Sequence, residues 1–192
     1  MATLTAPPAA TLTDEACMAE PEIQGRYDIV HGVRVSQPKV SWRRQRIIGN
    51  LSRAMSRYER PTGCQAVISP FDVLIRRTPL QIRQPDILLI SHDRLRQGGG
   101  SPEIGPLGIG PELVVEIILG NDTEQTLRDK IADYRAIRVD ECWVVRPKAG
   151  TVELLILTPR RARSFAVYGE REIFSSLAFR GLGVPVADVL AA

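Results

Sequence analysis

Three ionisable residues occupy sequence positions where an isolated charge would be costly to bury. Asp86 begins the apolar run 87–90, and Glu116 lies inside the apolar run 113–119. At 100° per residue, Lys130 falls on the apolar face of a predicted helix. A buried charge is destabilising unless an opposite charge or a metal compensates it. Because two acids and one amine can compensate one another, we expect the three side chains to share a pocket.

This combination suggests phosphodiester hydrolysis. Two carboxylates on neighbouring strands form a hard oxygen site for Mg²⁺ or Mn²⁺. Such a cation polarises a phosphodiester and acidifies its bound water, and an ammonium group stabilises developing phosphate charge. We therefore predict Asp86, Glu116 and Lys130 as catalytic residues, with both acids as metal ligands. Asp72 and Gln84 are weaker candidates for the rim of the site.

Each of the three residues also has a purely structural interpretation. The Pro-Asp pair at Asp86 is common at strand entries, and Glu116 could be a salt-bridged strand residue. Lys130 could reach solvent along the helix surface. The joint pattern favours a site, because each residue relieves the unfavourable burial of the others.

The elements that must position these residues follow from hydrophobic periodicity. Helices are predicted over 41–58 and over 123–137, the second with Asp122 as its N-cap. A mobile surface loop is expected over 97–111, and the apolar segment 182–190 should pack on the core edge. These elements predict a mixed α/β domain built around one sheet. The expected strands are a hairpin over 27–35 and the runs 65–68, 71–76, 82–91, 112–119, 141–145, 152–157 and 164–168.

Length and composition exclude several classes of protein. The 192 residues suit one domain, with 44% hydrophobic and 24% charged residues. No apolar stretch approaches the length of a transmembrane helix, and the first 20 residues lack Lys and Arg, so we expect a cytoplasmic protein. Three well-separated cysteines and two histidines argue against a disulfide framework and a zinc cluster. We interpret residues 1–22 as a disordered or weakly ordered tail and 23–192 as the domain.

Arginine dominates the basic residues, with 22 Arg and three Lys, and the net charge is +3. This balance permits a nucleic-acid partner without requiring one. Arg43, Arg46, Arg53 and Arg57 line one stripe of the first predicted helix and are candidates for phosphate contacts. The alternative is a solvated helix face.

An ordered set of short segments resembles the Uma2 family, bacterial endonucleases of the PD-(D/E)XK superfamily. The resemblance extends from about Tyr27 to Leu190. It implies a restriction-endonuclease-like core, with a mixed sheet flanked by helices and added antiparallel strands, over residues 23–192. The segments that carry it are 27–32, 71–73, 84–87, 111–117, 129–130 with Tyr134, 142–145 and 151–153.

The resemblance also implies site residues. Asp86 matches the Pro-Asp carboxylate of the family and Glu116 its second acid. Ile118 replaces the lysine of the usual E-x-K triplet, and Lys130 matches a helix lysine that takes its place. The implied activity is a metal-dependent DNA endonuclease that uses Mg²⁺ or Mn²⁺.

Three departures from the family pattern leave a second interpretation open. Val33 replaces an acid, Arg44 a histidine, and Arg146 an Asp that the family usually has. The alternative is therefore a nuclease-fold module that binds nucleic acid or protein without cleaving. A third alternative is the same core acting on another phosphate ester. A homodimer would suit double-strand cleavage.

Overall fold

The computed structural model describes residues 11–19, 25–37, 41–120 and 122–191, with only the backbone described at 60–62. Its centre is a six-stranded mixed sheet in the order β10-β9-β8-β7-β6-β3. Strands β7 and β8 pair in parallel, and the other neighbours pair antiparallel. The six strands are β3 (Cys64–Ile68), β6 (Ile87–Ser91), β7 (Leu113–Ile117), β8 (Glu141–Arg146), β9 (Thr151–Leu157) and β10 (Ala162–Gly169).

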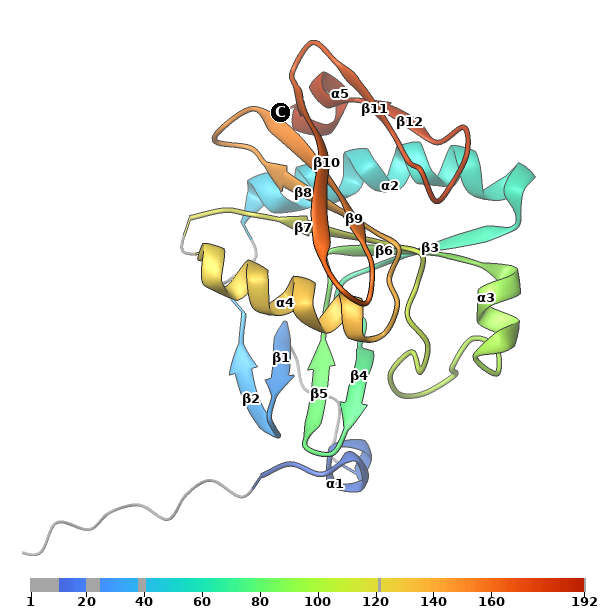
Figure 1. Cartoon of the computed structure of the whole chain (residues 1–192), viewed down its shortest axis with the longest axis vertical. Helices are drawn as coiled ribbons and strands as arrows, with labels where there is room; N and C mark the ends of the chain where they lie inside the picture. Colours follow the sequence, from blue (N-terminus) through green and yellow to red (C-terminus); the bar gives the residue numbers. More distant parts are fainter. Residues whose placement is uncertain (1–10, 20–24, 38–40, 121, 192) are drawn as a thin grey trace, which may run out of the picture.

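Helices cover both faces of this sheet. Helix α2 (Trp42–Thr62) lies on one face and α4 (Glu124–Ala136) on the other, as Figure 1 shows. Every residue of β7 is buried, because a strand covered on both faces needs no polar side. The apolar run around Glu116 is therefore a central strand. The predicted mixed α/β architecture is confirmed.

Helix α2 has a capping side chain at its start, a glycine at its end and an apolar face between them. The Ser41 hydroxyl accepts a hydrogen bond from the Arg44 N–H, and Gly63 ends the helix in the left-handed region at φ 65°. Ile47, Leu51 and Met55 are fully buried in the core shared with β6 and β7. The sequence thus predicts the position of α2 and its apolar face.

A second, four-stranded antiparallel sheet has the order β2-β1-β5-β4. It projects below α4 in the view of Figure 1, and a small core containing Ile29 and Ile82 supports it. The predicted hairpin over 27–35 is confirmed, because β1 and β2 pair antiparallel. The four strands are β1 (Tyr27–Val30), β2 (Val33–Ser36), β4 (Val73–Arg77) and β5 (Leu80–Arg83).

Three short helices and one small sheet complete the described chain. The C-terminal segment packs on the α2 side of the core, as predicted, through Val184, Val186 and Val189. None of the described helices has the length and apolar character needed to cross a membrane. The remaining elements are α1 (Asp14–Ala19), α3 (His92–Gln97), β11 (Ile173–Ser175), β12 (Gly183–Pro185) and α5 (Val186–Leu190).

Predictions for two segments outside the site differ from the structure. Within the predicted tail 1–22, residues 14–19 form helix α1, and Leu12 packs against the small core; residues 1–10 and 20–22 lie outside the described part. The predicted mobile loop 97–111 is anchored at Leu107, which is buried and exchanges backbone hydrogen bonds with Asp72 and Leu74. In both segments an apolar residue packs into a core, and the composition of the segment alone does not predict this packing.

Gly110 lets this loop pass against the C-terminal end of α4. An added Cβ would lie 2.1 Å from the backbone oxygen of Ile137. We expect Gly110→Ala to lower the free energy of unfolding by about 1–3 kcal/mol, since the backbone must shift. Gly108 has no atom within 4 Å of such a Cβ, so Gly108→Ala should change stability by less than about 0.5 kcal/mol. Urea denaturation measures both, and equal effects would contradict the packing argument.

Candidate active site

Asp86 lies at the junction of the two sheets. The sequence predicts one strand over 82–91, but this prediction is wrong, because the segment divides into β5 and β6 in different sheets. Pro85 lies between the two strands and has no N–H to donate to a sheet ladder. The break places the Asp86 side chain in the interior, where it is fully buried.

Glu116 faces Asp86 across the β6–β7 pair. Ile87 pairs with Val115 in this antiparallel ladder. One residue further along, the same register sets Asp86 opposite Glu116, and directly opposed residues of an antiparallel pair share one face of the sheet. Glu116 is 3% exposed. The two acids are therefore brought together as predicted.

Lys130 reaches Glu116 from helix α4. Its Nζ lies 2.9 Å from Glu116 Oε2, and the Tyr134 hydroxyl donates to Glu116 Oε1 at 2.5 Å. Burial raises the pKa of Glu116, and the Lys130 ammonium opposes this shift. Burial alone would lower the pKa of Lys130, but Glu116 and Asp28 outweigh it and raise that pKa. Lys130 therefore stays charged inside the protein.

Asp86 is held by two arginines and one backbone amide. Its Oδ2 accepts from Arg44 Nη1 at 2.6 Å and from the Ile117 N–H at 2.7 Å. Arg26 Nη2 lies 2.9 Å from Oδ1, outside hydrogen-bond geometry, so Oδ1 accepts no hydrogen bond from the described residues. Two carboxylates thus face three cationic side chains.

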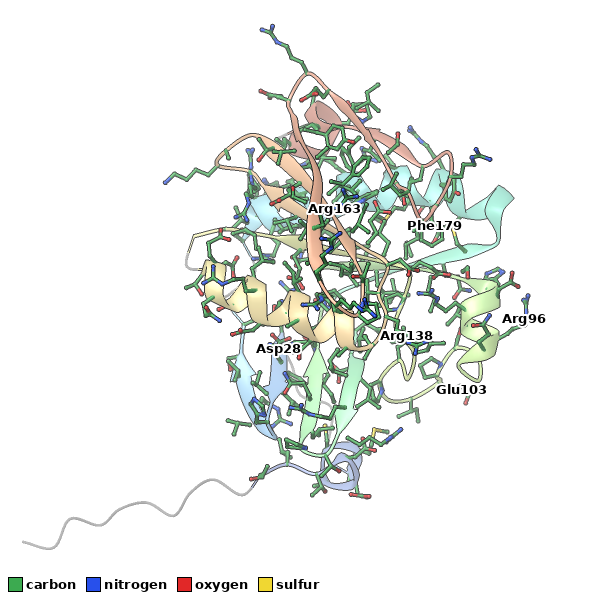
Figure 2. All side chains as sticks on the ribbon, viewed as in Figure 1. Asp28, Arg96, Glu103, Arg138, Arg163 and Phe179 are labelled. Carbon is green, nitrogen blue, oxygen red and sulfur yellow. The ribbon has the colours of Figure 1, made fainter. Side chains whose placement is uncertain are left out.

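Asp28 organises the hairpin side of the site and lies below α4 in Figure 2. One carboxylate oxygen accepts from the Gln84 N–H and from Gln37 Nε2. The other accepts from Arg83 Nη1 at 3.0 Å and lies 4.0 Å from Lys130 Nζ. Asp28 therefore connects the small sheet to the lysine of the site.

A small cavity adjoins this cluster. It has a volume of about 20 Å³, roughly the space of one water molecule. Its lining includes Arg44, Glu116, Asp122 and Lys130. The cavity thus lies beside Glu116, whereas Asp86 does not line it directly.

The donors fit a divalent cation in part. Asp86 Oδ1 is a buried oxygen without a hydrogen bond from the described residues, and Glu116 supplies a second carboxylate. Within the described ranges, however, no three Asp, Glu, His or Cys side chains are grouped to hold a metal. A cation here would complete its coordination with water, backbone or substrate oxygens, as Mg²⁺ commonly does.

Asp72 and Gln84 lie on another side of the junction from this cavity. Gln84 Nε2 donates to Asp72 Oδ1 at 2.8 Å, and burial raises the pKa of Asp72. Both residues line a separate cleft of about 470 Å³ that also includes Tyr27 and Phe71. Gln84 precedes Asp86 by two residues and Asp72 contacts Gln84, but neither residue lines the small cavity.

The arginine stripe lies along α2 away from the acidic pair. Arg43, Arg53 and Arg57 are exposed, and Arg46 is half-buried. Arg46, Arg53 and Arg57 line a groove of about 560 Å³ together with the segment 181–185. The structure therefore does not bring this stripe to the small cavity.

Sequence reasoning did not assign site roles to Arg26, Asp28 and Tyr134, and it gave Asp122 a different role. The N-cap of α4 is Thr123, whereas the Asp122 carboxylate accepts from Arg44 and from the Leu119 N–H. Arg44 was visible only as a departure from the family pattern. Its partner Asp86 is 42 residues away, so no local spacing could predict the pair.

Comparisons with known proteins indicate a family and a fold. A family model named Uma2, described as putative restriction endonuclease, matches residues 16–187. One similar solved structure is that of a putative nuclease belonging to DUF820 from Anabaena variabilis. It has a TM-score of 0.74 and 14% identity, and the match covers 94% of this chain and 98% of that one. No curated protein shows significant similarity. The restriction-endonuclease-like fold that the sequence predicts is confirmed.

Proposed function

Because the chain belongs to the Uma2 family of putative restriction endonucleases, we propose that it is a metal-dependent DNA endonuclease that hydrolyses phosphodiester bonds. One observation carries the proposal: three distant residues meet in the interior, with Lys130 Nζ 2.9 Å from Glu116 and Asp86 opposite Glu116. Burying two acids and an amine is costly, and a reaction that needs all three explains the cost.

Each residue has a distinct part in the proposed reaction. Asp86 and Glu116 would hold Mg²⁺ or Mn²⁺, which when bound polarises a phosphate oxygen and acidifies a water molecule. Lys130 places a permanent positive charge beside Glu116, where it orients the attacking water or stabilises negative charge on the phosphate. Tyr134 fixes the other oxygen of Glu116 and so orients this carboxylate.

The DNA partner is part of the same proposal. The exposed arginines of α2 offer a phosphate-binding surface, which would position the duplex without reading its sequence. A two-fold homodimer would place two sites on opposite strands. Both features stay predictions that a salt-dependent gel shift and sedimentation can test.

Plasmid cleavage tests the activity. Supercoiled plasmid should be nicked or linearised by the wild type in Mg²⁺ or Mn²⁺ and left intact in EDTA. Asp86→Asn and Lys130→Gln should each reduce the rate by about 100-fold or more, as loss of one group in a hydrolytic site does. Product bands on agarose gels, followed over time, measure the rate.

The matched controls are Asp129→Asn and Lys148→Gln, which make the same chemical changes outside the cluster. Asp129 is exposed on α4 and Lys148 is exposed in the turn after β8. Both should cleave like the wild type. Undiminished cleavage by Asp86→Asn would identify a contaminating nuclease or a wrong site assignment.

A specific observation favours the non-cleaving alternative. Asp86 already has Arg44 and Arg26 as cationic neighbours, so its charge is balanced by side chains alone. A module of this kind would shift plasmid in a gel at low salt and leave it uncut in every metal tested. That result, with correctly folded protein, would replace the endonuclease proposal.

A further inference from the structure

The Arg44 guanidinium bridges two carboxylates at the site. Arg44 lies in the first turn of α2 and is 5% exposed. Its Nη1 is 2.6 Å from Asp86 Oδ2, and its Nη2 is 2.7 Å from Asp122 Oδ2. Because an arginine keeps its charge at any physiological pH, this bridge is a permanent cation at Asp86.

The two acidic partners of Arg44 differ in their surroundings. The Asp86 side chain is fully buried, whereas the Asp122 side chain is 17% exposed in the connection between β7 and α4. Asp122 also accepts from the Leu119 N–H, which holds its carboxylate in place. The guanidinium therefore keeps one fixed partner if its contact with Asp86 is lost.

Arg44 also lines the small cavity beside Glu116, together with Asp122 and Lys130. A divalent cation held by Asp86 and Glu116 must come close to the carboxylate that Arg44 already neutralises. Two positive charges at one buried carboxylate repel each other strongly in a low-dielectric interior. The metal and the guanidinium thus compete for Asp86.

We propose that Arg44 is a displaceable internal cation that lowers the affinity of the Asp86–Glu116 site for divalent metal, and that Asp122 is the partner that retains the displaced guanidinium. This inference rests on the proposed metal-dependent function. Asp86 and Glu116 would hold the cation, and Arg44 Nη1 would then leave Asp86 while Nη2 keeps its contact with Asp122.

The competition predicts opposite effects for the two partners. Arg44→Gln removes one of the two competing charges, and Arg26 stays 2.9 Å from Asp86 Oδ1. Mn²⁺ binding should tighten by roughly 10- to 100-fold, the range expected for one hydrogen bond between charged groups. Asp122→Asn removes the charge that retains the displaced guanidinium and keeps an oxygen for the Leu119 N–H, so binding should weaken. In the double variant the Asp122→Asn effect should be smaller than in the wild-type background, because the part that acts through Arg44 is then absent, whereas the direct attraction between Asp122 and the cation is lost in both.

Mn²⁺ titrations followed by electron paramagnetic resonance of the free ion measure these affinities without any cleavage. Thermal unfolding first checks that each variant is folded. Arg44→Lys keeps the charge and should bind Mn²⁺ no more tightly than the wild type. Arg146→Gln is the second control, because it removes an arginine that is paired with Glu124 away from the site. Asp86→Asn should abolish Mn²⁺ binding at this site, so the difference from the wild type identifies the ions bound there.

The outcomes separate this inference from the proposed function. Wild-type binding that Asp86→Asn abolishes and Arg44→Gln leaves unchanged would overturn the role of Arg44 and keep the metal site. An equal gain in Arg44→Lys and Arg44→Gln would also overturn it, because loosened packing would then be the cause. No Mn²⁺ binding by the wild type or by Arg44→Gln at about 10 mM, roughly tenfold above the dissociation constants of the weakest oxygen-ligand sites, would overturn both proposals. If Arg44→Gln does not fold, Arg44→Met makes the same removal of charge; tighter binding by this variant supports the inference, and unchanged or weaker binding overturns it.

Discussion

Replacing Lys130 by methionine is expected to lower the free energy of unfolding by about 3–5 kcal/mol at pH 8. Methionine fills a similar volume but carries no charge, so Glu116 would keep a buried carboxylate without its cation at 2.9 Å. Tyr134 would remain as a hydrogen-bond donor to that carboxylate. The loss therefore measures the missing charge rather than a missing contact surface.

The same substitution should be less damaging in acid. Burial raises the pKa of Glu116 above its ordinary value of 4.5, so the folded state takes up a proton more readily than the unfolded chain. The cost of keeping Glu116 ionised is present above its raised pKa and disappears as the pH falls through it. Removal of the Lys130 charge raises this pKa further. The difference between Lys130→Met and wild type should thus shrink from pH 8 towards pH 5.

Urea denaturation at several pH values measures this dependence. The wild type keeps Lys130 charged over the whole range, since its raised pKa lies above the ordinary 10.5. Lys148→Met is the matched control, because Lys148 is exposed, and its effect should be small at every pH. A loss below about 1 kcal/mol at pH 8, or one that grows in acid, would contradict the buried ion pair.

The sequence predicts a site residue where a charged side chain occupies a position that the surrounding apolar pattern marks as buried. Glu116 lies inside a run that is covered on both faces, and Lys130 shares its helix face with Leu127 and Tyr134, so each signals a partner. Their contact then follows from the β7–α4 connection, which returns the helix over the strand that precedes it. This part of the site is encoded in local patterns.

The remaining partners depend on long-range geometry. Arg44 meets Asp86 because the start of α2 lies over the junction between β5 and β6, and Arg26 and Asp28 arrive from the hairpin. No periodicity in any one segment shows that these elements converge. The break at Pro85 has a local signal, because residues 83–86 interrupt the apolar pattern and a proline is disfavoured inside a central strand. That the two halves join different sheets depends on long-range geometry.

Glu141 shows that a buried acid beside an apolar run is not sufficient evidence of a site. It begins β8 much as Asp86 precedes β6, and it is 1% exposed. Its Oε2 accepts from the Ser176 hydroxyl and from the N–H groups of Leu177 and Ala178, each at 2.9 Å. Its Oε1 accepts from Trp143 Nε1 at 2.5 Å. The described residues supply it with four donors and no cation.

These contacts assign Glu141 a structural role on the other face of the sheet. Trp143, two residues along β8, belongs to the core that α2 covers, and alternation places Glu141 on the same face. Glu116 lies towards α4, with Lys130 and Tyr134. Glu141 therefore fixes the turn that starts at Ser176 and takes no part in the acidic pair.

We expect Glu141→Ala to lower the free energy of unfolding by about 3–5 kcal/mol, because two buried and two partly buried donors lose their acceptor at once. Glu141→Gln should also destabilise, since its amide would direct a donor towards the Trp143 indole or towards the three donors at 176–178.

Glu170→Ala, at an exposed position, should change stability by less than about 0.5 kcal/mol. Urea denaturation gives the energies, and Mn²⁺ binding and plasmid cleavage by the folded fraction should match the wild type. If Glu141→Ala unfolds no more easily than Glu170→Ala, the structural role is contradicted. If it folds normally but no longer binds Mn²⁺, the Glu141 carboxylate belongs to the site.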